Sequence, residues 1–416
     1  MAAIAIVLAG GRGTRSADPS QAKLAQVIGG KTLMHRHLDL LAGTQITEVL
    51  VVAGHLGDQV QELCDTFDHG GVSVRVIQED EQRGTVAALL LAADDTEADE
   101  FLVILGDILM SFPVDTFIND WRASCKEVAC IVHPSTHPED SDAAFPSYDG
   151  RVIVVAKSEP RDGIPNMSST GLFAITREGL ARYATCPDVG SDVLPAAAVA
   201  NDLFAYVSSH YFKDTGTQQR LAAAASDVAS GAFARRGRLT PRLALFLDRD
   251  GVLNAVQPEV YASRDYRLLP GVAAAISRAN SAGLPVIVVT NQPGIAKGLM
   301  TYQGHEEIRA ELDRQLGAAG AFVDDYFYCP HHPDAGFEGE VPDLKIPCDC
   351  RKPAPGMVLA AARKHHLDLA ASVMVGDTWR DQELAASTGM AFVHAAGAPE
   401  IESDAAIVRG IERITC

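Results

Sequence analysis

The sequence predicts an α/β protein with two doubly wound domains. Three observations support this fold class. The chain has 416 residues, which exceeds what one hydrophobic core usually organises; short apolar runs alternate with helix-like stretches; and an irregular segment divides them. The apolar runs, rich in Val, Ile and Leu, lie at 4–9, 49–53, 72–77, 101–105, 128–132, 152–155, 243–247, 284–289, 372–375 and 391–394. Between two of these runs, Ile308, Leu312 and Leu316 recur four residues apart and predict a helix that ends near Gly317. Alternating strands and helices are typical of parallel sheets covered on both faces.

The irregular segment at 226–242 mixes small, glycine, proline and basic residues and has little periodicity at its end. We therefore expect a first domain at 1–235, a linker at 236–241 and a second domain at 242–416. The sequence contains no internal repeat and no low-complexity tract.

Composition limits the classes of function. Hydrophobic residues make up 47% and charged residues 21%, the balance of a globular enzyme. The net charge of −19 repels polyanions, so we expect no nucleic-acid partner. Anionic small substrates would require clustered basic residues or a divalent cation. No apolar stretch reaches the ~20 residues of a membrane span, and the segment MAAIAIVLAGG reads as a strand rather than a signal. We expect no membrane partner and a cytoplasmic location, and a homo-oligomer is compatible with the sequence.

Polar signatures follow four strands of the second domain. Ligands bind at the carboxyl ends of strands in open α/β sheets, so these residues mark a candidate site. They are Asp248 and Asp250 in DRDGVLN, Thr290 and Asn291 in TNQ, Arg351 and Lys352 in CRKP, and Asp377 in VGD, with Asp381 four residues later. Residues i and i+2 of a strand point to one face, so Asp248 and Asp250 can address one phosphorus atom. A carboxylate approaches a phosphate dianion only when the charge is neutralised, which predicts Mg²⁺ here.

In this order the four motifs resemble those of the haloacid dehalogenase superfamily of phosphotransferases, in its capless form. The resemblance implies that Asp248 is the nucleophile that forms an aspartyl-phosphate, and that Asp250 is the general acid and base. The expected Mg²⁺ site contains Asp248, Asp250 and Asp377, with a backbone carbonyl as a further ligand. Lys352 and Thr290 are expected to bind the phosphoryl oxygens, and Asn254, Asn291 and Arg351 to bind substrate.

A cysteine-rich loop precedes CRKP. Cys329 and His331, then Cys348 and Cys350, have the spacing of a closed tetrahedral set of three thiolates and one imidazole, which predicts a structural zinc. Such a metal could supply on the order of 10 kcal/mol of ordering free energy to an irregular loop. His332 is not expected to be a ligand. The remaining cysteines, Cys64, Cys125, Cys130, Cys186 and Cys416, show no disulfide framework, which indicates a reducing compartment.

The loop is similar to those of two phosphatase families, the D-glycero-D-manno-heptose 1,7-bisphosphate phosphatases and the histidinol-phosphate phosphatases. Its length, together with DRDGVLN and TNQPGIAKG, looks like the heptose family.

The first domain begins with a glycine-rich turn, LAGGRGTR at 8–15, directly after its first strand. Gly10, Gly11 and Gly13 let backbone amides approach phosphate oxygens. With partners further along the chain, the turn resembles the sugar-1-phosphate nucleotidyltransferases. The resemblance implies a nucleotide site at Leu8, Ala9, Gly10, Gly11, Gly13, Thr14, Gln78, Gly84 and Thr85. It also implies Mg²⁺ at Asp107 and Asp214, catalytic Arg15 and Lys23, with Arg12 as a further cation, and a sugar phosphate at Lys157.

The two resemblances imply consecutive reactions. We expect a bifunctional enzyme that dephosphorylates heptose 1,7-bisphosphate at C7 and couples the resulting 1-phosphate to a nucleotide, with GTP favoured. Gln78, Gly84 and Thr85 leave the base open. One alternative is a phosphatase for histidinol phosphate or another small phosphomonoester, joined to an independent sugar nucleotidyltransferase. Another makes the first domain a non-catalytic nucleotide-sugar sensor.

Overall fold

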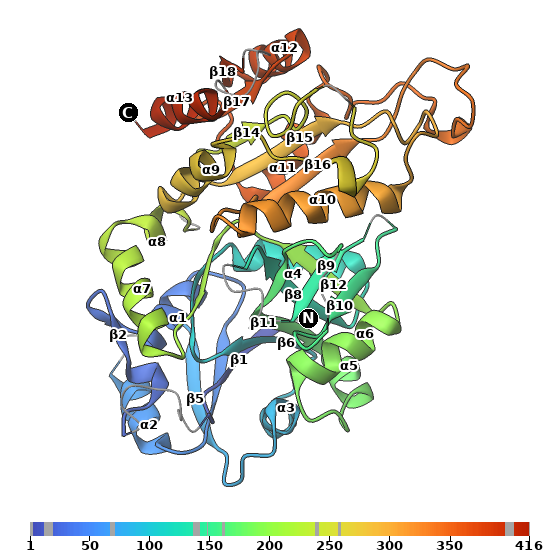
Figure 1. The fold of residues 1–416 in the computed structure, drawn as a ribbon. Coiled ribbons are helices and arrows are strands. Elements are labelled where there is room, and N and C mark those ends of the chain that lie inside the picture. The colour runs from blue at the N-terminus through green and yellow to red at the C-terminus, as the bar shows by residue number, and fades with distance from the viewer. Residues whose placement is uncertain are drawn as a thin grey trace. The chain divides into compact units, whose positions relative to one another are not determined.

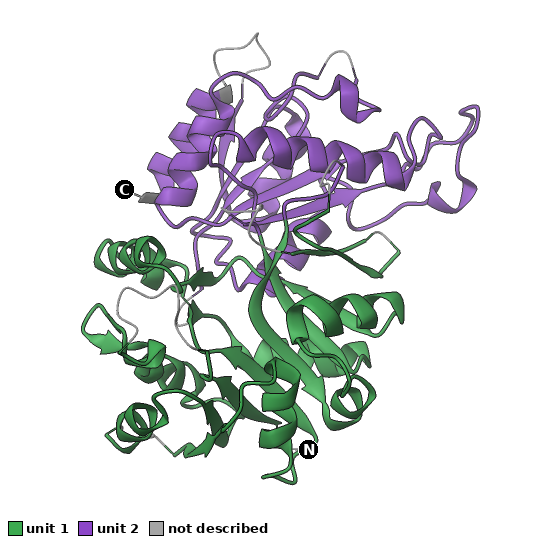
Figure 2. Cartoon of the chain, turned by 60° about the horizontal axis from the view of Figure 1, so that its bottom comes forward, with its two compact units in different colours: residues 1–133, 139–159, 167–237 green, residues 134–138, 160–166, 238–416 purple. Residues whose placement is uncertain are grey.

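The computed structural model describes residues 3–11, 20–66, 71–135, 142–147, 149–159, 163–237, 241–256, 259–395 and 403–415. The chain divides into two compact units, coloured separately in Figure 2. The first unit contains residues 1–133, 139–159 and 167–237, and the second contains 134–138, 160–166 and 238–416. No described helix is long and apolar enough to cross a membrane.

The first unit is built on a nine-stranded sheet within the described residues. Its strands are β1 (Ala3–Leu8), β4 (Glu48–Ala53), β5 (Ser73–Gln78), β6 (Glu100–Leu105), β8 (Val128–His133), β9 (Ala143–Pro146), β10 (Val152–Val155), β11 (Ser168–Thr176) and β12 (Leu203–Val207). Two small ribbons add β2 (Val27–Ile28) with β3 (Lys31–Thr32), and β7 (Ile108–Ser111) with β13 (Tyr211–Asp214). The helices are α1 (Leu33–Leu41), α2 (Gly57–Asp65), α3 (Thr85–Ala93), α4 (Val114–Ser124), α5 (Arg177–Arg182), α6 (Leu194–Val199), α7 (Gln218–Ala229) and α8 (Ala232–Arg235). Short 3-10 and π turns lie at Lys23–Ala25 and Val189–Val193.

The sheet of the first unit is mixed, whereas strand and helix alternation predicts a parallel one. β1 pairs in parallel with β4 and β6, and β4 with β5. β11 instead runs antiparallel to both β6 and β8. The sequence SSTGLFAIT of β11 opens with polar residues and a glycine, and only its second half, LFAI, is apolar; the predicted strands do not include it.

Helices cover both faces of this sheet. Ala3, Ala5 and Val7 share a buried core with residues of α1, α2 and α4, whereas Ile4 and Ile6 alternate to the other face and are also buried. α3 lies on the opposite side of the strands from α1 and α2 (Figure 1).

The second unit contains a five-stranded parallel sheet in the order β16-β15-β14-β17-β18. The strands are β14 (Leu245–Leu247), β15 (Val286–Asn291), β16 (Asp325–Cys329), β17 (Val373–Gly376) and β18 (Ala391–His394). The helices are α9 (Val272–Ser281), α10 (Tyr302–Gly317), α11 (Gly356–His365), α12 (Trp379–Thr388) and α13 (Ser403–Thr415), with short 3-10 turns at Ser263–Asp265 and Pro342–Leu344. The predicted helix around Ile308 is α10, which does end at Gly317.

This sheet is doubly wound, as predicted. Leu245 and Leu247 share one core with residues of α9, α10 and α13, and Phe246 shares another with residues of α11 and α12. The three central strands β14, β15 and β17 are buried almost throughout, which explains why their sequences are nearly continuous apolar runs.

Candidate active sites

The carboxyl ends of β14, β15 and β17 bring the predicted phosphatase residues to one edge of the second sheet. Asp248 follows β14 directly, Thr290 and Asn291 end β15, and Asp377 follows Gly376, the last residue of β17. Because the three strands are parallel neighbours, their ends meet.

Lys352 lies at the centre of this edge. Its Nζ is 2.8 Å from Oδ2 of Asp248 and 2.7 Å from Oδ1 of Asp381, and only 2% of its side chain is exposed. Asn291 holds the backbone of Lys352, accepting from its N–H at 2.9 Å and donating to its carbonyl at 3.1 Å. Burial lowers the pKa of Lys352, but the two carboxylates outweigh burial and raise it, so the ammonium stays charged.

Three carboxylates surround the same point. Oxygen atoms of Asp248, Asp377 and Asp381 lie within 4.8 Å of one another. Burial, with the charge of Asp381, raises the pKa of Asp248 to about 7 against the opposing effect of Lys352. Oδ1 of Asp377 is buried and has no hydrogen-bond partner among the described residues. Crowded, desolvated carboxylates with an unsatisfied oxygen fit a hard divalent cation such as Mg²⁺. Gly251 has a φ of +82°, and a Cβ there would overlap the carboxylate of Asp377, so glycine is required.

This crowding predicts a pH-dependent stability. The folded pKa of Asp248, about 7, lies above its usual value of ~3.9. The folded state therefore binds the proton of Asp248 more tightly than the unfolded state does. Protonated Asp248 adds to the free energy of unfolding below about pH 4, and this contribution is lost as the pH rises through 7. Burial also raises the pKa of Asp377, so this residue makes stability decrease with rising pH in the same way.

We expect the unfolding temperature of the magnesium-depleted wild type to decrease as the pH rises from 5 to 8. The decrease should be larger than that of the Asp248→Asn variant, which lacks the titrating carboxylate. Saturating Mg²⁺ should remove most of that difference. Dialysis rather than chelation is the appropriate treatment, because a chelator would also strip other metals. Parallel pH profiles for the two proteins would contradict the assignment.

The side chain of Asp250 is held by hydrogen bonds, and its predicted place in the metal site remains a prediction. Its carboxylate accepts from Arg249 at 2.9 Å, from Asn254 Nδ2 at 2.9 Å and from Gln292 Nε2 at 2.8 Å, and the carboxylate cluster contains Asp381 instead. Burial would raise the pKa of Asp250, but Arg249 and these hydrogen bonds outweigh it and lower the pKa. The contacts fix the orientation of this partly exposed carboxylate beside Asp248. The sequence shows Asp381 four residues after Asp377, but this spacing alone does not assign it a role.

The other predicted substrate residues are engaged locally. The hydroxyl of Thr290 accepts from Gln292 Nε2 at 3.0 Å. Arg351 donates to the carbonyl of His331 at 3.2 Å, which connects the phosphatase edge to the cysteine-rich loop. Their contacts with substrate remain predictions.

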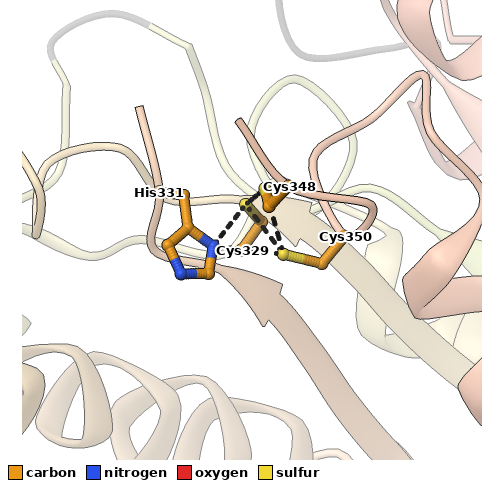
Figure 3. A group of neighbouring side chains, drawn as sticks. All are labelled: Cys329, His331, Cys348 and Cys350. Carbon is orange, nitrogen blue, oxygen red and sulfur yellow. Dashed lines mark hydrogen bonds between the residues drawn. The ribbon is translucent and has the colours of Figure 1, made fainter. Parts of the chain in front are cut away.

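The predicted zinc ligands lie together (Figure 3). Sγ of Cys350 lies 3.3 Å from Sγ of Cys329 and 3.3 Å from Sγ of Cys348, and 3.2 Å from Nδ1 of His331. Three sulfur atoms and one imidazole nitrogen at this spacing fit a tetrahedral zinc. Burial and the hydrogen bond with Cys348 raise the pKa of Cys350 to about 11, so the thiolate form depends on a cation. His332 is outside the group; its Nδ1 accepts from the N–H of Asp334.

We expect Cys350→Ser to lose zinc and to destabilise the second unit by several kcal/mol, because structural zinc contributes about 10 kcal/mol or more in small sites. Elemental analysis and thermal unfolding measure both effects. Cys186→Ser, at a free cysteine of the first unit, is the matched control. Equal zinc content in the two variants would refute the ligand assignment.

In the first unit, a cavity of about 300 Å³ opens at the carboxyl ends of β1 and β6. Its walls include most of the predicted nucleotide residues, namely Leu8, Ala9, Gly10, Gly11, Gly84 and Thr85, and also Lys23 and Asp107. Gln78 lines a second, more open cavity of about 850 Å³. Arg12, Gly13, Thr14 and Arg15 lie outside the described residues.

Asp107 and Asp214, the predicted metal pair, face the same space, and their binding of Mg²⁺ remains a prediction. Thr215 donates to the carbonyl of Asp107 through both its N–H and its hydroxyl, each at 2.8 Å. A Cβ built on Gly216 would lie 2.9 Å from Oδ1 of Asp214 and 3.3 Å from Oδ2 of Asp107, so the two carboxylates face the same space. Lys23 Nζ is 2.7 Å from Oδ2 of Asp107. Asp107 and Lys23 line the cavity, whereas Asp214 lines neither cavity and pairs with Arg220 at 2.6 Å through its Oδ2. A carboxylate and a cation at the cavity wall are compatible with Mg²⁺-assisted phosphate chemistry.

Lys157 does not line either cavity. It is exposed after β10, and its backbone N–H donates to Asp142 at 2.9 Å. Its proposed contact with a sugar phosphate remains a prediction.

Comparisons with known proteins match both units. Residues 5–207 match the model of the MobA-like NTP transferase domain, and residues 349–397 match that of the HAD-hydrolase-like family. A D-glycero-beta-D-manno-heptose-1,7-bisphosphate 7-phosphatase of Escherichia coli O6:H1 is 40% identical over 147 residues, 35% of this chain and 75% of the relative. That of Escherichia coli K12 is 39% identical over 158 residues, 38% of this chain and 81% of the relative. A solved D,D-heptose 1,7-bisphosphate phosphatase from B. bronchiseptica, complexed with magnesium and phosphate, is 34% identical, with a TM-score of 0.35, over 41% of this chain and 99% of that chain.

The chain is therefore a bifunctional enzyme that joins a nucleotidyltransferase domain to a phosphatase of the haloacid dehalogenase type. Through its C-terminal part it belongs to the family of D-glycero-beta-D-manno-heptose-1,7-bisphosphate 7-phosphatases.

Proposed function

We propose that the second unit removes the 7-phosphate of D-glycero-D-manno-heptose 1,7-bisphosphate. The first unit then transfers a nucleotidyl group to the resulting heptose 1-phosphate and releases pyrophosphate, with GTP as the favoured donor. The observation that carries the proposal is the buried Lys352 between Asp248 and Asp381, beside Asp377, in a chain of this family.

The residues of the second unit support a two-step transfer. Asp248 attacks the phosphorus and the bond to the C7 oxygen breaks. Asp250, whose pKa is lowered in the unliganded structure, first takes up a proton from solvent when the anionic substrate binds and then gives that proton to the leaving alkoxide. A water molecule then loses a proton to Asp250 and attacks the aspartyl-phosphate, which frees phosphate and restores Asp248. Lys352 offsets negative charge on the phosphoryl oxygens throughout. Bound Mg²⁺ at Asp248, Asp377 and Asp381 would neutralise the nucleophile and the phosphate.

The residues of the first unit support nucleotidyl transfer. The phosphate of the sugar attacks the α-phosphorus of the nucleoside triphosphate, and pyrophosphate leaves. Lys23 lies where it can offset charge on the triphosphate, and Asp107 and Asp214 would hold Mg²⁺, which supplies charge neutralisation when bound.

Mass spectrometry of reaction products tests the whole proposal. The full chain with Mg²⁺ is incubated with either anomer of heptose 1,7-bisphosphate and with each of four nucleoside triphosphates, and separately with histidinol phosphate. We expect a heptose 1-phosphate from the bisphosphate alone, and a nucleotide-linked heptose when GTP is added. Preferential hydrolysis of histidinol phosphate would contradict the assigned substrate.

A further inference from the structure

The two cavities of the first unit share one wall, formed by Gly10, Glu79 and Gln82. Glu79 follows β5 and is only 8% exposed. Its backbone N–H donates to the carbonyl of Ala53 at 2.8 Å, so its position is set by the sheet. Its carboxylate occupies the space where a Cβ of Gly10 would be, so a larger residue at position 10 would displace this carboxylate. The glycine-rich turn thus makes room for an acidic side chain in the nucleotide cavity.

The charged side chains of the cavity predict how a nucleotide is oriented in it. Lys23 pairs with Asp107, the carboxylate predicted to bind metal, and its Nζ lies 3.9 Å from where a Cβ of Gly11 would be, whereas the carboxylate of Glu79 lies beside Gly10. A buried carboxylate repels a triphosphate. We therefore expect the phosphates beside Lys23 and the base or ribose beside Glu79.

The side chains predicted to contact the base are already engaged. Gln78 donates to the carbonyl of Gly54 at 3.0 Å. The hydroxyl of Thr85 donates to Asp188 at 2.9 Å and accepts from the N–H of Val189 at 2.8 Å. The other oxygen of Asp188 accepts from the N–H of Ser191 at 2.9 Å. The carboxylate of Glu79 accepts from the backbone N–H of Arg83 and, with two oxygens, keeps further acceptor capacity at the wall of the cavity.

We propose that Glu79 reads the base of the nucleotide by accepting hydrogen bonds from N1–H and the 2-amino group of guanine. A carboxylate accepts at two oxygens and donates at none. Guanine alone among the four bases presents two adjacent donors on one edge, which match it; uracil flanks its single N–H with carbonyl oxygens, which a carboxylate repels. The inference rests on the proposed function and supplies a physical reason for its GTP preference.

Nucleotide binding to the full chain, measured by calorimetry, tests the inference without requiring turnover. GTP, ITP, ATP, CTP and UTP are compared on the wild type, on Glu79→Gln and on Glu81→Gln. Glu81 is exposed and lines neither cavity, so Glu81→Gln is a control that removes the same charge away from the nucleotide site. We expect Glu79→Gln to weaken GTP binding by about 10- to 100-fold, as for loss of a paired base contact. ATP binding should change little. ITP, which lacks the 2-amino group, should bind the wild type more weakly than GTP does.

The outcomes separate this inference from the proposed function. Equal affinity of the wild type for all nucleotides, or a GTP preference that survives Glu79→Gln, would overturn the inference and leave heptose turnover untouched. Equal weakening of every nucleotide would assign Glu79 to the ribose hydroxyls and also overturn it. A GTP preference that follows Glu79, in a protein without heptose turnover, would support the base contact while the proposed function fails.

Discussion

Asp248→Asn is expected to lower phosphate release from heptose 1,7-bisphosphate by at least about 1,000-fold, because an amide cannot replace the carboxylate as nucleophile. The geometry adds a second reason. Asp248 is one partner of the buried Lys352 and one of the three clustered carboxylates, so the change weakens both phosphate and cation binding. Steady-state phosphate release measures the effect.

The same variant should retain nucleotidyl transfer when heptose 1-phosphate is supplied directly, because the residues of that reaction lie in the other unit. Asp265→Asn, an exposed aspartate of the second unit, is the matched control and should keep phosphate release within about twofold of the wild type. Substantial phosphate release by Asp248→Asn would remove the covalent mechanism from the proposal.

Strand-end motifs made the phosphatase edge predictable, because parallel strands place their carboxyl ends together whatever the details of packing. The contacts that Asp250 and Asp381 form were harder to predict from the sequence. Asp381 accepts from the N–H and hydroxyl of Thr378 as part of a helix cap, which a sequence can suggest. Its ion pair with Lys352 depends on how a distant loop returns to the sheet. The contacts of Asp250 with Gln292, 42 residues away, depend on the same tertiary packing.

The first unit shows the same limit. The glycine-rich turn, Lys23 and Asp107 line one cavity, in accordance with the order of motifs. Thr85 also lines this cavity, and its hydroxyl donates to Asp188, 103 residues away, so its contact with nucleotide stays a prediction. A sequence shows which groups can form hydrogen bonds and not which are already satisfied. No motif in the sequence marks Glu79, the neighbour of Gln78, as a site residue; the sequence shows only that it carries a carboxylate.

Asp107→Asn is expected to lower pyrophosphate release from GTP and heptose 1-phosphate by at least about 100-fold, because charge stabilisation by a bound metal is worth several kcal/mol in the transition state. The carboxylate shares its space with Asp214 and holds Lys23 at 2.7 Å. An amide at this position binds a divalent cation poorly and frees Lys23 from its partner. A coupled assay for pyrophosphate, at saturating and limiting Mg²⁺, separates the loss of metal affinity from the loss of rate.

Asp99→Asn, at an exposed aspartate of the same unit, should change pyrophosphate release little, and Asp107→Asn should leave phosphate release by the second unit intact. The pair of variants also distinguishes an enzyme from a sensor. A sensor domain would bind nucleotide without releasing pyrophosphate in the wild type, so Asp107→Asn would have no rate to lower. Asp107 lines the cavity beside Lys23 and faces the same space as Asp214, which favours catalysis, because a domain that only binds nucleotide does not require two neighbouring carboxylates there.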